Sequence, residues 1–91
     1  MKTIENEQLK KFKYLYKKKY FNKLINELES YLNINKNNDE IFTLLGLSYL
    51  SVANFRLAKK NLKNSLQLKN NNPIVHNALG VALTFLNKEH E

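Results

Sequence analysis

The sequence contains no cysteine and no tryptophan, one proline, and only two glycines in 91 residues. Without cysteine, the chain can form neither a disulfide framework nor a thiolate metal site. The two glycines, Gly46 and Gly80, are too far apart for a phosphate-binding glycine loop. The longest mainly apolar run, 74–86, is too short and too interrupted to span a bilayer. We therefore expect a soluble, cytoplasmic protein.

Catalytic residue sets are also lacking. His76 and His90 are the only histidines, and neither has an acidic residue at the spacing of a helical relay. We interpret His76 as a structural residue. The tail 88–91 resembles a frayed terminus more than a chelating site. The sequence therefore predicts no enzyme activity, no cofactor and no metal site.

The net charge of +7 is unevenly distributed along the chain. Segments 1–23 and 56–69 are strongly basic, whereas 24–55 is acidic on balance. Two groups of basic residues stand out: Lys10, Lys11, Lys13, Lys17, Lys18, Lys19 and Lys23 near the N-terminus, and Arg56, Lys59, Lys60 and Lys63 at the spacing of one helix face. The N-terminal group could meet an acidic partner or a phosphate backbone, whereas we interpret the second group first as a solvated helix face. No nucleic-acid recognition motif accompanies either group.

Apolar residues at spacings of three and four predict five helices and no strand. The predicted helices cover 4–18, 20–34, 39–51, 55–68 and 73–87. Asparagine-rich breaks separate some of them, and we expect Asn54 and Asn72 to act as N-caps. The connections are short, so consecutive helices should run antiparallel.

The pattern restarts every 34 residues, without a gap. The matching pairs are Leu45 and Gly46 with Leu79 and Gly80, Phe21 with Phe55, Leu28 with Leu62, Leu32 with Leu66, and Asn37 and Asn38 with Asn71 and Asn72. A fixed period of this length is typical of stacked supersecondary units rather than of one globular core.

The middle unit resembles a tetratricopeptide repeat. The residues that carry the resemblance are Phe42, Leu45, Gly46, Tyr49 and Ala58, at the places where that family has its large aromatic, Leu-Gly, Tyr and first Ala. Gly46 and Ala58 are expected to be small because the two helices of a unit cross closely there. The first unit departs from the pattern, with Phe12 at the Gly place and Leu24 at the Ala place. The 35-residue pentatricopeptide family, which reads RNA, is a competitor that the 34-residue spacing disfavours.

The resemblance implies an all-α fold, a right-handed superhelical stack of antiparallel helix pairs. This α-solenoid would have about two and a half repeats and five helices. The chain would form a single domain, 1–91, with units at about 5–38 and 39–72 and the first helix of a third at 73–88.

The resemblance also implies a concave groove lined by the first helix of each unit. Its partner-facing residues would be Asn6, Leu9, Lys13, Tyr16 and Lys17, then Glu40, Thr43, Leu47, Leu50 and Ser51, then Ile74, Asn77, Val81, Thr84 and Phe85. Such a groove suits a helix or peptide that carries acidic and apolar residues. The family's clamp for C-terminal carboxylates is absent, because its five places are occupied by Leu9, Lys13, Leu47, Ile74 and Ala78.

The leading interpretation is a non-enzymatic protein–protein interaction module, an adaptor or a small chaperone-like protein. The alternative, from another class, is a basic helical-repeat protein associated with nucleic acid. The last predicted helix is apolar nearly all round, which predicts that another element covers it. We expect a homodimer through Val75, Leu79, Leu83 and Leu86, with another protein or a longer repeat array as the other possibilities.

Overall fold

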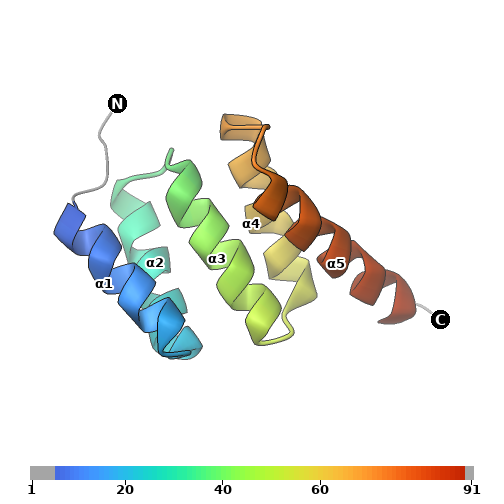
Figure 1. The fold of residues 1–91 in the computed structure, drawn as a ribbon, viewed down its shortest axis with the longest axis horizontal. Coiled ribbons are helices and arrows are strands. Elements are labelled where there is room, and N and C mark those ends of the chain that lie inside the picture. Colours follow the sequence, from blue (N-terminus) through green and yellow to red (C-terminus); the bar gives the residue numbers. More distant parts are fainter. Residues whose placement is uncertain (1–5, 90–91) are drawn as a thin grey trace.

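The computed structural model describes residues 6–89, and this range forms five α-helices (Figure 1). They are α1 (Asn6–Lys17), α2 (Phe21–Ile34), α3 (Asp39–Ser51), α4 (Phe55–Leu68) and α5 (Pro73–Glu89). The predicted bounds of α3 and α4 are confirmed. Helix α2 begins one residue later than predicted, α1 ends one residue earlier, and α5 continues past Asn87. The predicted start of α1 at Ile4 lies outside the described residues.

Asparagine side chains cap the N-termini of three helices. The Asn38 Oδ1 atom accepts a hydrogen bond from the Ile41 N–H at 3.2 Å, and Asn54 does the same for the Leu57 N–H at 3.2 Å. The Asn72 Oδ1 atom accepts from the Ile74 N–H at 3.0 Å. These bonds satisfy N–H groups that have no partner inside the helix. The predicted caps Asn54 and Asn72 are confirmed, whereas sequence reasoning took Asn38 only as a helix breaker.

Two turns have the same backbone geometry 34 residues apart. Lys19 and Ala53 both adopt the left-handed conformation, with φ of 65° and 62°. In the first turn the Tyr20 N–H donates to the Leu15 carbonyl, and in the second the Asn54 N–H donates to the Tyr49 carbonyl. This pattern is the Schellman motif, which usually has glycine at the left-handed position. The two turns therefore reverse the chain in the same way after α1 and after α3.

The helices pack mainly on their neighbours in the chain, in antiparallel order (Figure 1). The α3–α4 pair has the most extensive contact, and α5 packs on α4 and also touches α3. Helices α1, α3 and α5 lie nearer the viewer in Figure 1, with α2 and α4 behind them. The molecule is elongated, measuring 43 × 27 × 22 Å.

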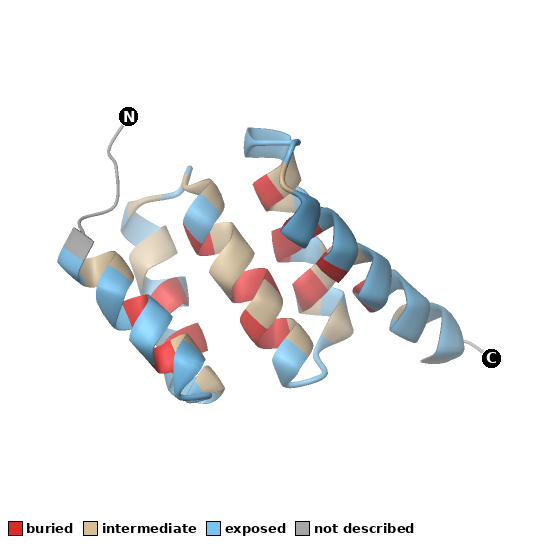
Figure 2. Cartoon of the chain, viewed as in Figure 1, coloured by how far each residue is buried: buried red, intermediate tan, exposed pale blue. Residues whose placement is uncertain are grey.

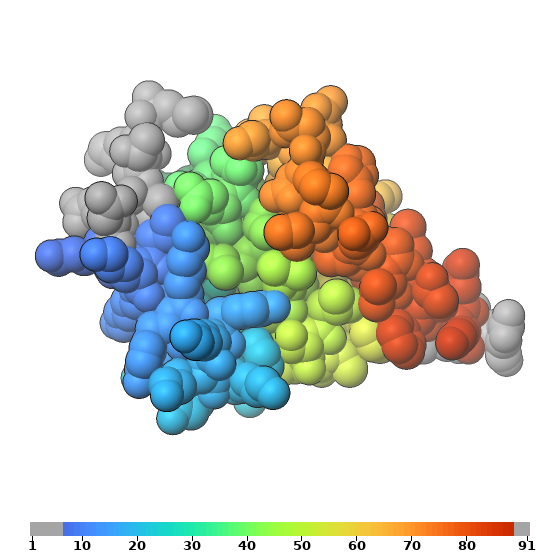
Figure 3. Space-filling view, viewed as in Figure 1, coloured from blue at the N-terminus to red at the C-terminus, as the bar shows by residue number. Residues whose placement is uncertain are grey.

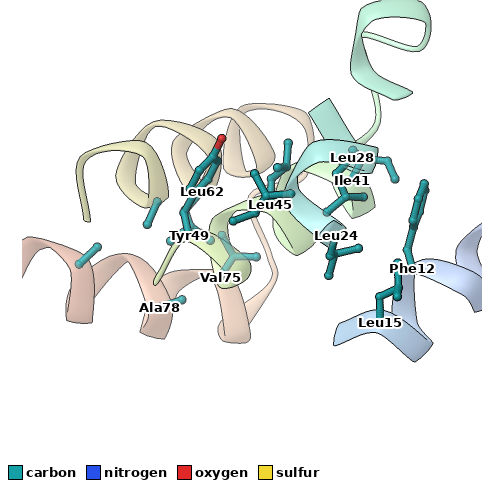
Figure 4. Packing of buried hydrophobic residues seen from close by; sticks show 13 residues of the cluster. Phe12, Leu15, Leu24, Leu28, Ile41, Leu45, Tyr49, Leu62, Val75 and Ala78 are labelled. Atoms are coloured by element: carbon teal, nitrogen blue, oxygen red, sulfur yellow. The ribbon is translucent and has the colours of Figure 1, made fainter. Parts of the chain in front are cut away.

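One apolar cluster runs through the stack (Figures 2 and 4). Phe12 and Leu15 of α1 stand at one end of it, and Val75 and Ala78 of α5 stand at the other (Figure 4). Between them lie buried side chains of the middle helices: Leu24, Ile25, Leu28, Ile41, Leu45, Tyr49, Ala58 and Leu62. Each of the large aliphatic side chains contributes roughly 1.5–3 kcal/mol by leaving water.

Gly46 of α3 lies in close contact with Leu62 of α4. A Cβ atom at this position would lie 2.5 Å from the Cγ and Cδ2 atoms of Leu62 and 3.3 Å from its backbone nitrogen. Only glycine leaves room for Leu62, which is itself fully buried. The prediction that a small residue is needed at Gly46 is therefore confirmed.

Candidate functional site

The layer of α1, α3 and α5 presents one continuous surface, named here the α1–α3–α5 face (Figure 3). In that view α3 (green) lies between α1 (blue) and the segment from the α4–α5 turn into α5 (orange to red). The face carries a cleft of about 200 Å³ between α1 and the first half of α3. Its lining consists of Leu9, Lys13, Asp39, Glu40, Thr43, Leu44 and Asn72.

The cleft combines an apolar floor with opposite charges on its two sides. Leu9 of α1 and Leu44 of α3 are half-buried and pack against the core. Lys13 stands on the α1 side, and Asp39 and Glu40 stand in the first turn of α3. The acidic pair is placed favourably, since a helix N-terminus carries a partial positive charge. An occupant would thus meet a positive group on one side and a negative pair on the other.

The structure brings four of the predicted groove residues together in this cleft: Leu9, Lys13, Glu40 and Thr43. The Thr43 hydroxyl is already engaged, because it donates to the Asp39 carbonyl at 2.8 Å and lies 2.7 Å from the Ser65 Oγ atom. Sequence reasoning missed the other lining residues, Asp39, Leu44 and Asn72. Asn72 was assigned only as a cap, and nothing in its local sequence shows that the α4–α5 turn reaches α3.

The remaining groove residues lie outside this cleft. Leu47 and Leu50 are half-buried against the core. Those exposed to solvent are Lys17, Ser51, Ile74, Asn77, Val81, Thr84 and Phe85. No side chain is described for Asn6.

Two predicted groove aromatics pack against residues at the beginning of the rear helices. The Tyr16 ring meets Phe21 edge to face, with centroids 5.6 Å apart. The Phe85 ring stacks on Phe55 at 4.6 Å with an interplanar angle of 4°. Aromatic pairs of this kind contribute about 0.5–1.5 kcal/mol beyond their buried area. Both rings therefore have a structural role as well as any role in binding.

A second cleft, of about 230 Å³, is lined by residues of α2, α3 and α4. Glu29 of α2, Lys36 of the α2–α3 connection and Lys60 of α4 supply its charged groups. The Tyr49 hydroxyl donates to the Glu29 Oε2 atom at 2.5 Å, which ties α3 to α2. Burial, and then the hydrogen bond and negative charge of Glu29, raise the pKa of Tyr49 to about 12. At neutral pH Tyr49 is therefore a hydrogen-bond donor and not an acid–base group.

The two predicted basic surfaces are solvent-accessible. The seven N-terminal lysines are all exposed, although Lys11 pairs with Glu27 of α2 at 2.7 Å. Lys18 lies 5.8 Å from the centre of the Tyr14 ring. On α4, Arg56, Lys60 and Lys63 are exposed and Lys59 is half-buried. A shallow hollow of about 440 Å³ at the α1–α2 turn is lined by residues 19–23, namely Lys19, Tyr20, Phe21, Asn22 and Lys23.

The predicted self-association residues of α5 do not share one exposed surface. Val75 is fully buried by the chain itself, so it is not available to a partner. Leu79 and Leu86 are half-buried, and Leu83 keeps 39% of its surface exposed. Helix α5 has apolar residues on nearly all sides for two reasons. One side packs on α3 and α4, and other apolar residues, among them Ile74 and Val81, face solvent.

His76 differs from its predicted role as a structural packing residue. Its side chain is exposed, and its Nε2 atom lies 2.8 Å from the Asn70 carbonyl oxygen. The ring therefore braces the α4–α5 turn instead of filling the core. His90 lies outside the described residues.

Within residues 6–89, no three acidic or histidine side chains gather in a group that could hold a metal ion. No helix in that range is long and apolar enough to cross a membrane. Comparison of the chain with protein-family models, with curated proteins and with solved structures finds no match.

Proposed function

We propose that this chain is a non-enzymatic protein-binding module, a tetratricopeptide-like stack that holds a helix or peptide of another protein on its α1–α3–α5 face. The observation that carries the proposal is the cleft on this face. Four residues expected to face a partner line it together, although they come from different helices. A cleft with an apolar floor and a few polar groups at its edge is typical of a binding site.

Several features support a repeat architecture for the stack. Helices α2 and α4 both run for 14 residues and begin 34 positions apart, and α3 and α5 also begin 34 positions apart. The two Schellman turns have the same spacing. With the elongated shape and the two helix layers, these features favour a right-handed superhelical arrangement.

The chemistry of the cleft defines its occupant. An apolar side chain would contact Leu9 and Leu44, and an acidic side chain of the same peptide would approach Lys13 and the nearby Lys17. A basic or amide group would be directed to Glu40 on the other side. An amphipathic helix supplies all three from one face, because residues three and four apart lie together.

The test begins with affinity capture on the immobilised chain and then compares variants against the captured partner. Lys13→Glu and Glu40→Lys reverse the charges on the two sides of the cleft, whereas Lys63→Glu makes the same charge change as Lys13→Glu at an exposed residue of α4. We expect the cleft variants to weaken binding by about tenfold or more, which is about 1.4 kcal/mol. The Lys63→Glu variant should bind like the wild type. Equal weakening by all three variants would contradict the proposal.

A second candidate function, nucleic-acid binding, is favoured by one observation. At the α1–α2 turn, exposed lysines surround Tyr20, which keeps 54% of its surface exposed and could stack on a base. If this surface is used, the affinity for generic DNA or RNA should fall steeply with salt concentration, and Lys19→Glu with Lys23→Glu should reduce the slope. The absence of binding at low salt would eliminate this candidate.

A further inference from the structure

The two glycines of the chain occupy corresponding positions in α3 and α5 but have different surroundings. Gly46 is buried beneath Leu62 of α4, and a Cβ atom there would lie 2.5 Å from that side chain. Gly80, 34 residues later, is exposed, and a Cβ atom there would meet nothing within 4 Å. The place that α4 occupies beside α3 is therefore open beside α5.

The residues around Gly80 are also more exposed than the corresponding residues around Gly46. On α3, the neighbours of Gly46 on this side are Phe42 and Tyr49, each one turn away, and the adjacent Leu45, and all three are half-buried or buried. The corresponding α5 residues are His76, Leu79 and Leu83. His76 is exposed, Leu79 is half-buried, and Leu83 remains 39% exposed. We name these three and Gly80 the Gly80 flank: a surface whose counterpart packs against a helix, but which has no helix on it among the described residues.

Two properties of the Gly80 flank favour a second copy of this chain as its occupant. Residues 73–87 contain no charged side chain, although the chain has a net charge of +7. Two copies can therefore meet here without the like-charge repulsion that the lysines of α1 and α4 would cause. The flank is also self-complementary, because the open notch at Gly80 and the exposed knob of Leu83 lie one helical turn apart on the same side.

We propose that the Gly80 flank is the interface of a two-fold symmetric homodimer in which Leu83 of each copy packs over Gly80 of the other. A two-fold axis makes the same surface serve both copies, so each contact occurs twice. In this antiparallel register His76 of one copy faces Asn87 of the other, which pairs polar with polar residues. The interface does not depend on the proposed function, because none of the four flank residues lines the cleft.

The oligomeric state of the purified chain tests the proposal. We expect light scattering at micromolar concentration to give twice the 10.7 kDa mass of one chain. Leu83→Glu should give a monomer. Gly80→Leu should raise the dissociation constant about tenfold or more while the monomer stays folded, since a Cβ atom at this exposed position meets no other atom within 4 Å. The matched control is Val81→Glu, at a residue that is 44% exposed on the other side of α5 and should still dimerise.

A compensating double variant tests the register itself. Gly80→Leu with Leu83→Ala exchanges knob and notch, so the two-fold pairing should restore most of the affinity that Gly80→Leu loses. Circular dichroism and thermal unfolding of each variant show whether the monomer remains folded. A wild-type monomer at all concentrations would overturn the proposal and leave the flank to a helix of another protein. Dissociation by Val81→Glu, or unchanged affinity of Gly80→Leu, would overturn it as well.

Discussion

The α1–α2 pair and the α3–α4 pair differ in how the space between their two helices is filled. In α3, Gly46 lets Leu62 of α4 approach to the helix backbone. The residue 34 positions earlier, in α1, is Phe12, which is fully buried and meets Tyr31 edge to face with ring centroids 5.8 Å apart. The helices of the α3–α4 pair come close because Gly46 has no side chain. In the α1–α2 pair, the aromatic ring of Phe12 fills the space between the helices.

The polar links of the two pairs differ too. Lys11 of α1 and Glu27 of α2 form an ion pair at 2.7 Å, with 53% and 27% of their side-chain surfaces exposed. In the α3–α4 pair the Ser65 hydroxyl of α4 lies 2.7 Å from the Thr43 hydroxyl and donates to the Asp39 carbonyl of α3 at 3.2 Å. An exposed ion pair contributes about 0–1 kcal/mol, so apolar packing dominates the α1–α2 pair. The α1–α2 pair should therefore be sensitive to lost atoms, and the α3–α4 pair to added ones.

The largest expected effect is at Phe12. Phe12→Ala should lower the free energy of unfolding by about 3–5 kcal/mol, because it removes a buried ring and leaves a cavity. Urea denaturation measures the change. Tyr14→Ala, at a 56% exposed ring on the same helix, is the control and should change stability by less than about 0.5 kcal/mol. A similar loss in both variants would mean that Phe12 is not the element that holds α1.

Substitutions at the two glycines should give the next largest changes in stability, and the two changes should have opposite signs. Gly46→Ala should destabilise the chain by about 1–3 kcal/mol, because the new Cβ collides with buried Leu62. Gly80→Ala should stabilise it by about 0.5–1 kcal/mol, because alanine is the better helix former and the site is open. Thermal unfolding of the two variants under monomeric conditions compares them directly. Two losses of similar size would refute the difference in surroundings.

Tyr49 links stability to alkaline pH. Tyr49→Phe should lose about 1 kcal/mol at neutral pH through the missing hydrogen bond. Burial and Glu29 raise the pKa of Tyr49 from 10.0 to about 12 in the folded chain, so the folded state holds this proton more tightly than the unfolded state. The resulting stabilisation is complete below pH 10 and is lost as the pH rises toward 12.

Denaturation at a series of pH values measures this effect. The two proteins differ only at this residue, so the difference between wild type and Tyr49→Phe isolates Tyr49. That difference should shrink between pH 10 and about 12. A difference that stays constant through this range would contradict the assigned pKa.

The smallest effect is a gain at Ser48. Its hydroxyl is fully buried and has no hydrogen-bond partner among residues 6–89, whereas the residue 34 positions later in α5 is buried Ala82. Ser48→Ala should stabilise the chain by about 0.5–1 kcal/mol, because it removes an unpaired polar group and favours the helix. Ser51→Ala, at an exposed serine that bonds the Leu47 carbonyl, is the matched control and should be within about 0.5 kcal/mol of wild type. A loss of stability at Ser48 would reveal a partner for its hydroxyl.

Local sequence signals were enough to predict the helices. Apolar spacing and asparagine-rich breaks located α3 and α4 to the residue, and the small residues Gly46 and Ala58 indicated where these two helices cross closely. The end of α5 was less well defined, because Asn87 is followed by residues that continue the helix to Glu89. A break in the pattern marks a boundary only where the backbone actually turns.

The candidate site was harder to predict because it depends on contacts between distant parts of the chain. Periodicity shows which side of α5 is apolar, but it does not show that Val75 is covered by its own chain while Leu83 is not. Likewise, Tyr16 and Phe85 were predicted to face a partner, yet the Tyr16 ring packs against Phe21 and the Phe85 ring against Phe55. Side-chain direction and the placement of Asn72 beside α3 required the three-dimensional arrangement.

Packing of each helix on its chain neighbours has a consequence for how the molecule folds and opens. Contacts that are close in sequence close only short loops, so helical hairpins can form early and folding should be fast, in the microsecond to millisecond range. Opening should start at the ends, where a helix has a neighbour on one side only. Amide hydrogens of α5 should then exchange with solvent faster than those of α3. A second copy on the Gly80 flank would slow that exchange, so the dynamics of α5 would depend on protein concentration.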